Sequence, residues 1–413
     1  MKKPVVYRIC LLWYTYSTLH SPGEAMLLSI FAQASDAVKY IVKKADMVLL
    51  AFCLVSTIYG IILIASATNY TGSYREVIVQ GAAAVIGLFA YFIFSTLDVE
   101  HYSEKWKWFF LFNLGFIALL LTPLGTGKYG NKSWLTASWL PTSIQPSEIV
   151  KLTFTVLLAK QMAWFRDNRK MRGLDSLFWP AAHAGLMFVW IVAISSDAGS
   201  GLVYLMIYAG MALAAGLAWY WFVAGFSLMG LGIGALVLLE KLPTHMLQRF
   251  IVLFDHSYDP RGVGWQQTRS LMAIGSGGLF GQGLFNGIQT QSTFSENLPE
   301  RQTDFIFAVC GEELGMMGCL AIIILEFLLV WRCFQTARIA KSTMGSLICV
   351  GFGTMLIFQT VENIGMCLFV MPVIGLTLPF FSSGGSSIVT LYAAMGIVSG
   401  VRNRSLPDWL RKT

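Results

Sequence analysis

Charged residues are scarce in this sequence of 413 residues. They occupy 12% of the positions, whereas apolar residues occupy 56%. Soluble domains contain about 25% charged residues, so this balance argues against a soluble core. Runs of about 20 apolar residues recur along the whole chain and are too long and continuous for the strands of a β-barrel. The sequence therefore predicts an all-α fold, a polytopic helical membrane protein.

Other absences narrow the function. The chain has no Walker sequence, Gly-rich dinucleotide loop or HExxH motif, so nothing supports coupling to ATP. It also has no repeat of 20–50 residues and no inverted pair of broken helices, the usual mark of a secondary transporter. The seven cysteines occur singly and without metal-ligand spacing, so neither a disulfide framework nor a metal site is indicated.

The apolar runs predict ten transmembrane helices and one large loop at about 240–303. A tight turn around Gly216–Ala218 joins the sixth and seventh helices. The predicted spans are 46–67, 77–96, 108–123, 147–164, 177–195, 200–216, 218–239, 304–331, 343–370 and 384–401.

Lysine and arginine are distributed unevenly between the two sides of these spans. With the N-terminus inside, 19 of them fall in inner segments, three in the short outer loops and five in the large loop. The positive-inside bias predicts that both termini are cytoplasmic and that the large loop is extracytoplasmic. The same bias explains the net charge of +7 without a nucleic-acid partner.

The predicted organisation has three parts: a cytoplasmic N-terminal segment at 1–44, a ten-helix membrane domain at 45–402, and a cytoplasmic tail at 403–413. The apolar stretch Ile9–Tyr16 is too short to span a membrane, and no small-residue cleavage site follows it, so a signal peptide is not indicated. Met1 and Met26 are both candidate start sites.

Three polar clusters stand out. The first, Gln145-Pro-Ser-Glu-Ile-Val-Lys151, enters the fourth span, and its proline suits a helix start. Glu148 and Lys151 share one helix face and can pair. Two interpretations stay open: an ion pair that lowers the cost of both charges, or a lysine that faces an anionic ligand with the glutamate orienting it.

The second cluster lies in the large loop. Arg249, Arg261 and Arg269 give this outer surface a positive potential that suits phosphate. Six glycines between Gly262 and Gly281 predict close backbone approach or tight re-entrant turns.

The third cluster is Leu298–Gly315. Asp304 lies where an apolar helix begins, as a helix cap or as a reactive acid, while Glu312 and Glu313 point about 100° apart further along the helix. Glycines 311, 315 and 318 allow close packing. Two weaker features are the Gly-Gly and hydroxyl-rich segment Leu378–Ser387, which suits an anion nest or close packing, and Asp197, for which a turn-forming or capping role is favoured.

In these motifs the sequence resembles the SEDS family (shape, elongation, division and sporulation), the RodA/FtsW group of bacterial cell-envelope proteins. The resemblance covers nearly the whole chain beyond residue 44, although Gln302 stands where the family usually has histidine. The matching motifs, in order, are Gln145–Glu148 with Lys151, Asp197-Ala-Gly199, Ala273–Gly278, Leu298–Glu300 with Thr303–Phe307, Gly311–Gly315, Leu378–Phe380 and Gly384–Ser387.

The resemblance implies a ten-helix peptidoglycan glycosyltransferase of the cytoplasmic membrane that polymerises lipid II on the outer face, with a class B penicillin-binding protein as partner. It implies that Asp304 is the catalytic carboxylate. The candidate residues for binding substrate or pyrophosphate are Lys151, Glu148, Arg249, Arg269, Gln267 and Ser270. The candidate supporting residues are Glu300, Thr303, Glu312, Ser386 and Ser387.

The expected reaction forms a β-1,4 bond with inversion. Asp304 acts as general base on the acceptor hydroxyl, and pyrophosphate leaves without protonation if cations compensate its charge, with or without Mg²⁺ or Mn²⁺. A lipid II flippase and a non-catalytic scaffold of the wall-synthesis complex remain alternatives. Whether the chain serves elongation, division or sporulation stays open.

Overall fold

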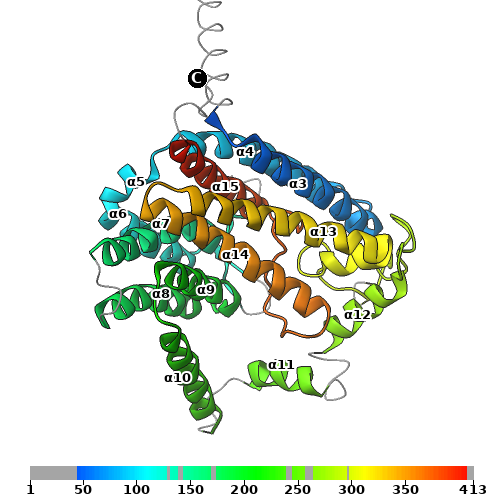
Figure 1. The fold of residues 1–413 in the computed structure, drawn as a ribbon. Coiled ribbons are helices and arrows are strands. Elements are labelled where there is room, and N and C mark those ends of the chain that lie inside the picture. The colour runs from blue at the N-terminus through cyan, green and yellow to red at the C-terminus, as the bar shows by residue number, and fades with distance from the viewer. Residues whose placement is uncertain are drawn as a thin grey trace, which may run out of the picture.

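The computed structural model describes residues 44–127, 131–137, 143–168, 174–238, 244–255, 264–294 and 297–406. Almost all regular structure in these ranges is helical (Figure 1). The long helices are α3 (Met47–Thr68), α4 (Arg75–Thr96), α6 (Trp106–Ala118), α7 (Pro146–Asp167), α8 (Leu174–Ser195), α9 (Ala198–Ala215), α10 (Trp219–Leu238), α13 (Ile306–Ile339), α14 (Thr343–Cys367) and α15 (Gly385–Ser405).

Short elements connect these helices. The antiparallel strands β1 (Gly125–Thr126) and β2 (Trp134–Leu135) pair in the connection between α6 and α7. The remaining short elements are α5 (Val99–Tyr102), η1 (Asn69–Thr71), η2 (Ser103–Lys105), η3 (Leu119–Leu121), α11 (Thr244–Phe254) and α12 (Trp265–Gly277).

Each of the ten predicted spans corresponds to one long helix, and the polytopic helical fold is confirmed. Among the described residues, six of these helices are long and apolar enough to cross a membrane by length and composition: α3, α4, α8, α9, α13 and α14. The helix starts and ends that the sequence marks with proline, aspartate and glycine are also confirmed. Pro146 opens α7, Asp197 caps α9, and Gly216 ends α9 in a left-handed conformation (φ 93°) before α10 begins.

The large loop is more structured than its sequence suggested. It contains α11 and α12. In Figure 1, α10 and α11 extend away from the other helices, whereas α12 lies against the first half of α13.

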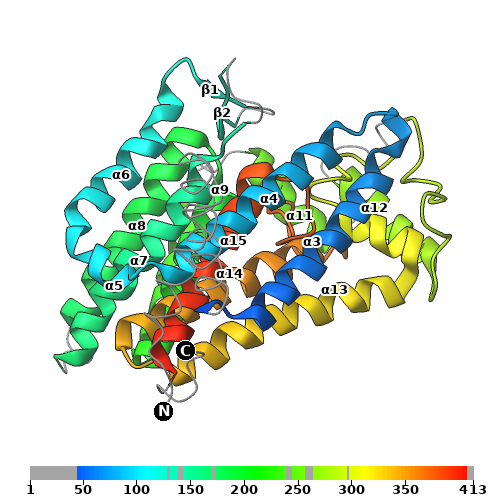
Figure 2. The ribbon, with the colours of Figure 1, turned by 90° about the horizontal axis from the view of Figure 1, so that it is seen from above.

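Small residues bring helices together in the remaining bundle, where α4 runs along α15 and α13 along α14 (Figure 2). A Cβ at Gly396 of α15 would lie 2.5 Å from the carbonyl oxygen of Tyr91 of α4. Close backbone contact of this kind is the main source of helix association in lipid, because burial of apolar surface gives no advantage there.

Helix α13 is interrupted at Gly315, which has φ 67° and ψ −162°. At this break the peptide segment after α12 supplies the missing hydrogen bonds. The amide of Met316 donates to the carbonyl of Gly278, and the carbonyl of Glu312 accepts from the amide of Gln282. A Cβ on Gly315 would lie 2.4 Å from the amide nitrogen of Gly281. The predicted close backbone approach of this glycine-rich run is therefore confirmed.

Candidate functional site

Asp304 lies in a tight turn immediately before α13. The amides of Asp304 and Phe305 both donate to the carbonyl of Glu300, at 3.0 and 3.2 Å, and Glu300 adopts a positive φ of 48°. The helix begins at Ile306, two residues after the approximate start expected from the sequence, and its cap, Phe305, makes no side-chain capping bond. A capping role for Asp304 is therefore excluded.

Two neighbouring segments hold this turn in place. Asn363 of α14 donates its side-chain amide to the carbonyls of Asp304 (2.9 Å) and Leu376 (2.8 Å). The hydroxyl of Ser382 donates to the carbonyl of Thr303 at 2.6 Å, and the amide of Ser383 donates to the carbonyl of Gln302 at 2.9 Å. These bonds fix the backbone of the turn and leave the Asp304 side chain out of the network.

The Asp304 carboxyl is half-buried and poorly solvated. Its pKa is raised to about 7, mainly by burial and also by the nearby Glu300 and Asp197 charges, while a hydrogen bond from the Thr303 hydroxyl acts in the opposite direction. Among the described residues, no backbone amide or cationic side chain donates a hydrogen bond to this carboxyl. An acid with a pKa near neutrality can take up and release a proton under physiological conditions, which a general base must do.

Glu312 and Glu313 have the opposite surroundings. Both are fully buried. Glu312 accepts from the amides of Gln289 (2.7 Å) and Thr290 (2.8 Å) and from the Thr290 hydroxyl (2.7 Å). Glu313 accepts from the Ser66 hydroxyl (2.5 Å), the side-chain amide of Gln291 (2.8 Å), and the amides of Phe285 (3.2 Å) and Gly287 (3.4 Å).

The 100° separation of these two glutamates suggested different environments. The structure instead brings one loop, residues 285–291, to both of them. Both glutamates act as buried structural acids in this arrangement. All three bonds to Glu312 and three of the four to Glu313 hold that loop against α13, and the fourth, from Ser66, joins Glu313 to α3.

Arg301, three residues before Asp304, contacts the preceding loop rather than the Asp304 side chain. Its side chain is 1% exposed. It donates to the carbonyls of Leu298 (3.0 Å), Ser292 (3.1 Å) and Thr290, and it stacks on the ring of Tyr70 at 4.0 Å. Arg301 therefore stabilises the loop that precedes the turn, and it influences Asp304 only through the backbone.

The first polar cluster forms the predicted ion pair. The ammonium of Lys151 lies 2.6 Å from Glu148 Oε1, and the two side chains are 1% and 7% exposed. The N-terminal turn of α7 also contacts the ends of two other helices. Gln145 donates its side-chain amide to Asp197 (3.4 Å) and its backbone amide to the hydroxyl of Ser386 (3.3 Å).

Asp197 links this cluster to Asp304. It caps α9, accepting from the amide (2.9 Å) and hydroxyl (2.7 Å) of Ser200, as its sequence position favoured. Its charge also acts on Asp304. The starts of α7, α9, α13 and α15 therefore lie at the same end of the molecule. The amino ends of helices carry partial positive charge, which favours an anionic ligand there.

The candidate residues of the large loop differ in their exposure and in their contacts. Arg249 is exposed and donates to the carbonyl of Val373 at 2.7 Å. Arg269 stacks on the ring of Trp265 at 4.2 Å. Gln267 and Ser270 are buried. Gln267 donates to the carbonyls of Met366 (3.1 Å) and Met371 (2.7 Å), and Ser270 donates to that of Cys367 (2.8 Å).

Gln267 and Ser270 therefore have a structural role that Arg249 and Arg269 do not share. The side-chain groups of Gln267 and Ser270 attach α12 to the end of α14, whereas the two arginines retain further donors. The predicted Arg261 lies outside the described residues. Ser387 is half-buried in the first turn of α15, next to Ser386.

Sequence reasoning missed two residues of α14 next to the turn. Glu362 is 2% exposed, has no hydrogen-bond partner of normal length, and interacts electrostatically with Asp304. Asn363 holds the carbonyl of Asp304, as described above. An acid and an amide inside a predicted span were a usable signal, because polar groups at that depth are functional by default.

A divalent cation has no ready-made protein site here. Among the described ranges, no three acidic, histidine or cysteine side chains come together as metal ligands. Mg²⁺ is often bound by one or two carboxylates together with substrate phosphates, so the predicted cation would depend on the pyrophosphate rather than on a protein cage. The cation stays a prediction.

Comparison with known proteins gives a consistent set of relatives. The family model for FtsW, RodA and SpoVE, described as "Cell cycle protein", matches residues 46–405. Stage V sporulation protein E of Bacillus subtilis is 32% identical over 375 residues, which cover 87% of this chain and 97% of the relative. A protein of Haemophilus influenzae named as a probable peptidoglycan glycosyltransferase FtsW is 35% identical over 310 residues, covering 73% and 75%.

Solved structures show the same architecture. A structure describing how a peptidoglycan synthase complex coordinates polymerization and crosslinking matches with a TM-score of 0.72 and 27% identity, covering 88% of this chain and 99% of that one. The crystal structure of the rod shape determining protein RodA of Thermus thermophilus matches with a TM-score of 0.62 and 25% identity, covering 88% and 98%.

Proposed function

The chain belongs to the FtsW, RodA and SpoVE family of cell cycle proteins, and from this premise we propose that it is a membrane-embedded peptidoglycan glycosyltransferase with Asp304 as its catalytic base. Its substrate is lipid II, and its product is a β-1,4-linked glycan strand. The observation that carries the proposal is the state of Asp304. It is a half-buried carboxyl with a pKa near neutrality, held on a fixed turn and free of hydrogen bonds from cations.

The chemistry requires a base of this kind. The 4-hydroxyl of the acceptor sugar attacks the anomeric carbon of the donor as its bond to the lipid pyrophosphate breaks. Asp304 takes the hydroxyl proton, and general-base catalysis of this kind is typically worth ~10²–10⁴-fold in rate. The fixed backbone of the turn supports this role, because a base must remain within hydrogen-bond reach of the proton that it removes.

The leaving group carries negative charge, and the same end of the molecule can compensate it. Lys151 is a buried cation in the second turn of α7, with Glu148 orienting its ammonium. Arg249 and Arg269 add positive charge from the large loop, and the amino ends of α7 and α15 add partial charge. With this compensation pyrophosphate leaves without protonation, so one carboxylate suffices for an inverting displacement.

The other candidate residues act by position. Glu300 raises the pKa of Asp304, and the Thr303 hydroxyl donates to the carboxylate of Glu300 at 3.3 Å. Gln267 and Ser270 hold α12 on α14, which sets the place of Arg269. The hydroxyls of Ser386 and Ser387 lie at the start of α15, where Ser386 accepts from the amide of Gln145. Glu312 holds the loop that precedes the turn.

The distribution of lysine and arginine supports an orientation with both termini in the cytoplasm, which places Asp304 at the outer face. The ten-helix domain at 45–402 then presents its polar end to the extracytoplasmic side, while the lipid tails remain between helices. The similarity to a synthase complex that couples polymerization and crosslinking supports a class B penicillin-binding protein as partner.

The direct test is polymerisation of purified lipid II in detergent, with and without a cognate penicillin-binding protein. We expect glycan strands from the wild type and none above background from Asp304→Ala. Glu104→Gln, which removes an exposed acid from the opposite end of the molecule, is the matched control and should polymerise normally. Equal polymerisation by wild type and Asp304→Ala would contradict the assignment of Asp304. If the wild type is inactive even with the partner, the flippase alternative is favoured.

A further inference from the structure

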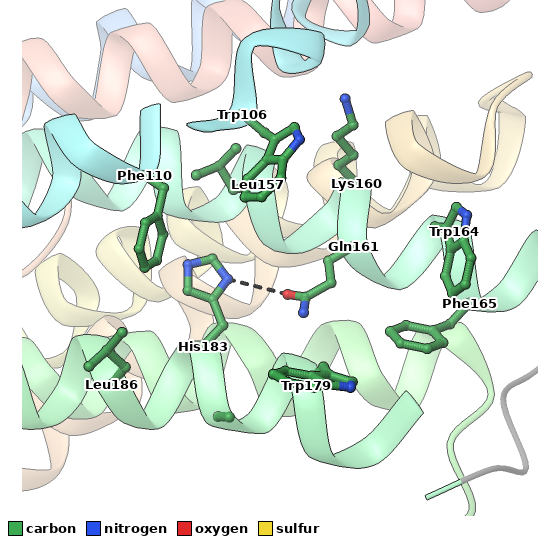
Figure 3. Close-up of a pocket in the computed structure, with 11 residues that line it drawn as sticks. Trp106, Phe110, Leu157, Lys160, Gln161, Trp164, Phe165, Trp179, His183 and Leu186 are labelled. Carbon is green, nitrogen blue, oxygen red and sulfur yellow. Dashed lines mark hydrogen bonds between the residues drawn. The ribbon is translucent and has the colours of Figure 1, made fainter. Parts of the chain in front are cut away.

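A cavity of about 620 Å³ opens between α6, α7 and α8 (Figure 3). It lies far from Asp304. Helix α7 starts beside Asp197 and Ser386 and runs for 22 residues, or ~33 Å. The side chains that α7 contributes to the cavity, Leu157–Phe165, come from its second half. The cavity is therefore at the other end of the bundle from the proposed active site, which makes no use of it.

Tryptophans surround the cavity. Trp106, Trp164 and Trp179 contribute one side chain each from α6, α7 and α8, and they are 48%, 52% and 56% exposed. Tryptophan is enriched where a membrane helix meets the headgroup level, because one part of the ring is apolar and its N–H can be hydrated. The three rings mark this end of the cavity as the boundary between acyl chains and headgroups.

The lining is apolar except for three residues. In Figure 3, His183 and Gln161 point toward one another, whereas the ammonium of Lys160 points away from them. His183 Nδ1 lies 3.3 Å from Gln161 Oε1, and His183 Nε2 is buried without a hydrogen-bond partner. Lys160 donates one hydrogen bond, to the carbonyl of Ser103 at 2.7 Å. An ammonium has three donors, so two remain for a ligand. Among the described residues no carboxylate lies within ion-pair distance of Lys160.

Further cations flank the same end. Lys105 and Lys107 precede and begin α6, with the ammonium of Lys107 5.7 Å from the centre of the Trp106 ring. Arg166 lies two residues after Trp164, in the last turn of α7. The acids at this end are Glu104, Asp167 and, in the first turn of α8, Asp175, against the four cations Lys105, Lys107, Lys160 and Arg166; Asp167 accepts from the hydroxyl of Thr343 on α14. The balance of charge around the opening is positive.

We propose that this cavity binds an anionic phospholipid of the cytoplasmic leaflet. An acyl chain lies among the aromatic side chains, past His183 and Gln161, and the phosphate lies at the ammonium of Lys160. The assignment to the cytoplasmic leaflet rests on the orientation in the proposed function. Basic pockets between membrane helices on this side are suited to anionic headgroups, and the volume is that of an ordinary ligand site.

Native mass spectrometry of the full chain in detergent tests this proposal without using enzymatic activity. The probes are phosphatidylglycerol, phosphatidylcholine with the same acyl chains, and a polyprenyl phosphate. We expect the wild type to retain phosphatidylglycerol about fivefold more strongly than phosphatidylcholine, the factor expected for one cation near a membrane surface. Lys160→Gln should remove this preference and leave the weaker binding of both lipids.

A second variant tests the cavity itself. Ala182→Phe fills it from α8 and should reduce retention of both phospholipids, whereas Val85→Phe, on the exposed face of α4, is the matched control and should not. Equal retention of the two phospholipids by the wild type would overturn the anionic headgroup. Unchanged binding in Ala182→Phe would overturn the site, and a preference for polyprenyl phosphate would overturn the lipid class. An inactive enzyme that still binds phosphatidylglycerol would affect only the proposed function.

Discussion

Asp304 and the pair Glu312 and Glu313 belong to one short stretch of sequence, yet their surroundings differ completely. Each glutamate accepts at least three hydrogen bonds and holds a loop in place. Asp304 has a fixed backbone and a side chain to which, among the described residues, no amide or cation donates, and burial together with the Glu300 and Asp197 charges raises its pKa to about 7. A carboxylate whose oxygens are all occupied stabilises the fold, whereas one left unoccupied at the end of a rigid turn is available for proton transfer.

The buried pair Lys151–Glu148 combines a structural contact with a proposed role in the reaction. Breaking this pair should have the largest effect on stability. Lys151→Met leaves a buried carboxylate without its partner, which typically costs about 3–5 kcal/mol. Thermal unfolding in detergent should show this loss, and the double variant Glu148→Gln with Lys151→Met should recover much of it. If Lys151 also compensates pyrophosphate, the double variant stays deficient in lipid II polymerisation. Recovery of both thermal stability and polymerisation in the double variant would show that the pair has only a structural role.

The glutamates should behave as structural acids. Glu312→Gln and Glu313→Gln each remove a charged acceptor from backbone or side-chain donors, so we expect each to lose ~1.5–3 kcal/mol of unfolding free energy. Hydrogen exchange should localise the loosening to residues 285–291. Protection in that loop equal to the wild type would show that the glutamates do not hold it.

Removing the charge of Asp304 should raise the stability of the protein, whereas removing the charge of Glu312 or Glu313 should lower it. Its pKa is raised from 3.8 to about 7 in the folded protein, so ionisation of Asp304 opposes folding. The stabilising contribution of the protonated group is complete below about pH 4 and is lost as the pH rises to about 7. Asp304→Asn should therefore unfold a few degrees higher than the wild type at pH 8, with a smaller difference at pH 5. A lower unfolding temperature at pH 8 would place Asp304 among the structural acids.

The smallest expected effect concerns the pH profile of the reaction. The charge of Glu300 raises the pKa of Asp304, so Glu300→Gln should lower that pKa and extend polymerisation to more acidic pH. Rates of lipid II consumption between pH 5 and 8 provide the measurement, and Glu104→Gln should leave the profile unchanged. A profile that moves to higher pH would mean that Glu300 is not the neighbour that tunes Asp304.

The sequence was sufficient for the helices because long apolar runs in a membrane protein have few alternatives. It also identified the starts of α7 and α9, where Pro146 and Asp197 carry local signals. Helices α11 and α12 were missed because a polar, glycine-rich loop resembles turns more than helices. The break at Gly315 could be anticipated only as close packing, since its cause is hydrogen bonding to residues 278–283.

The candidate site could be predicted from the sequence less completely than the fold. Glu148 and Lys151 are three residues apart, so their pairing follows from helix geometry. The direction of Arg301 could not be predicted, because its partners are carbonyls in a loop whose path depends on Glu312 and Glu313. Glu362 was overlooked within its span, and its closeness to Asp304 results from the packing of α14 against the turn.

The central distinction is tested most directly by polymerisation of lipid II normalised to the amount of folded protein, compared between Asp304→Asn and Glu312→Gln. We expect Asp304→Asn to be fully folded and to polymerise ~10²–10⁴-fold more slowly than the wild type. We expect Glu312→Gln to be less stable but to retain most of its activity per folded molecule. Substantial polymerisation by folded Asp304→Asn, or its loss from folded Glu312→Gln alone, would contradict the account.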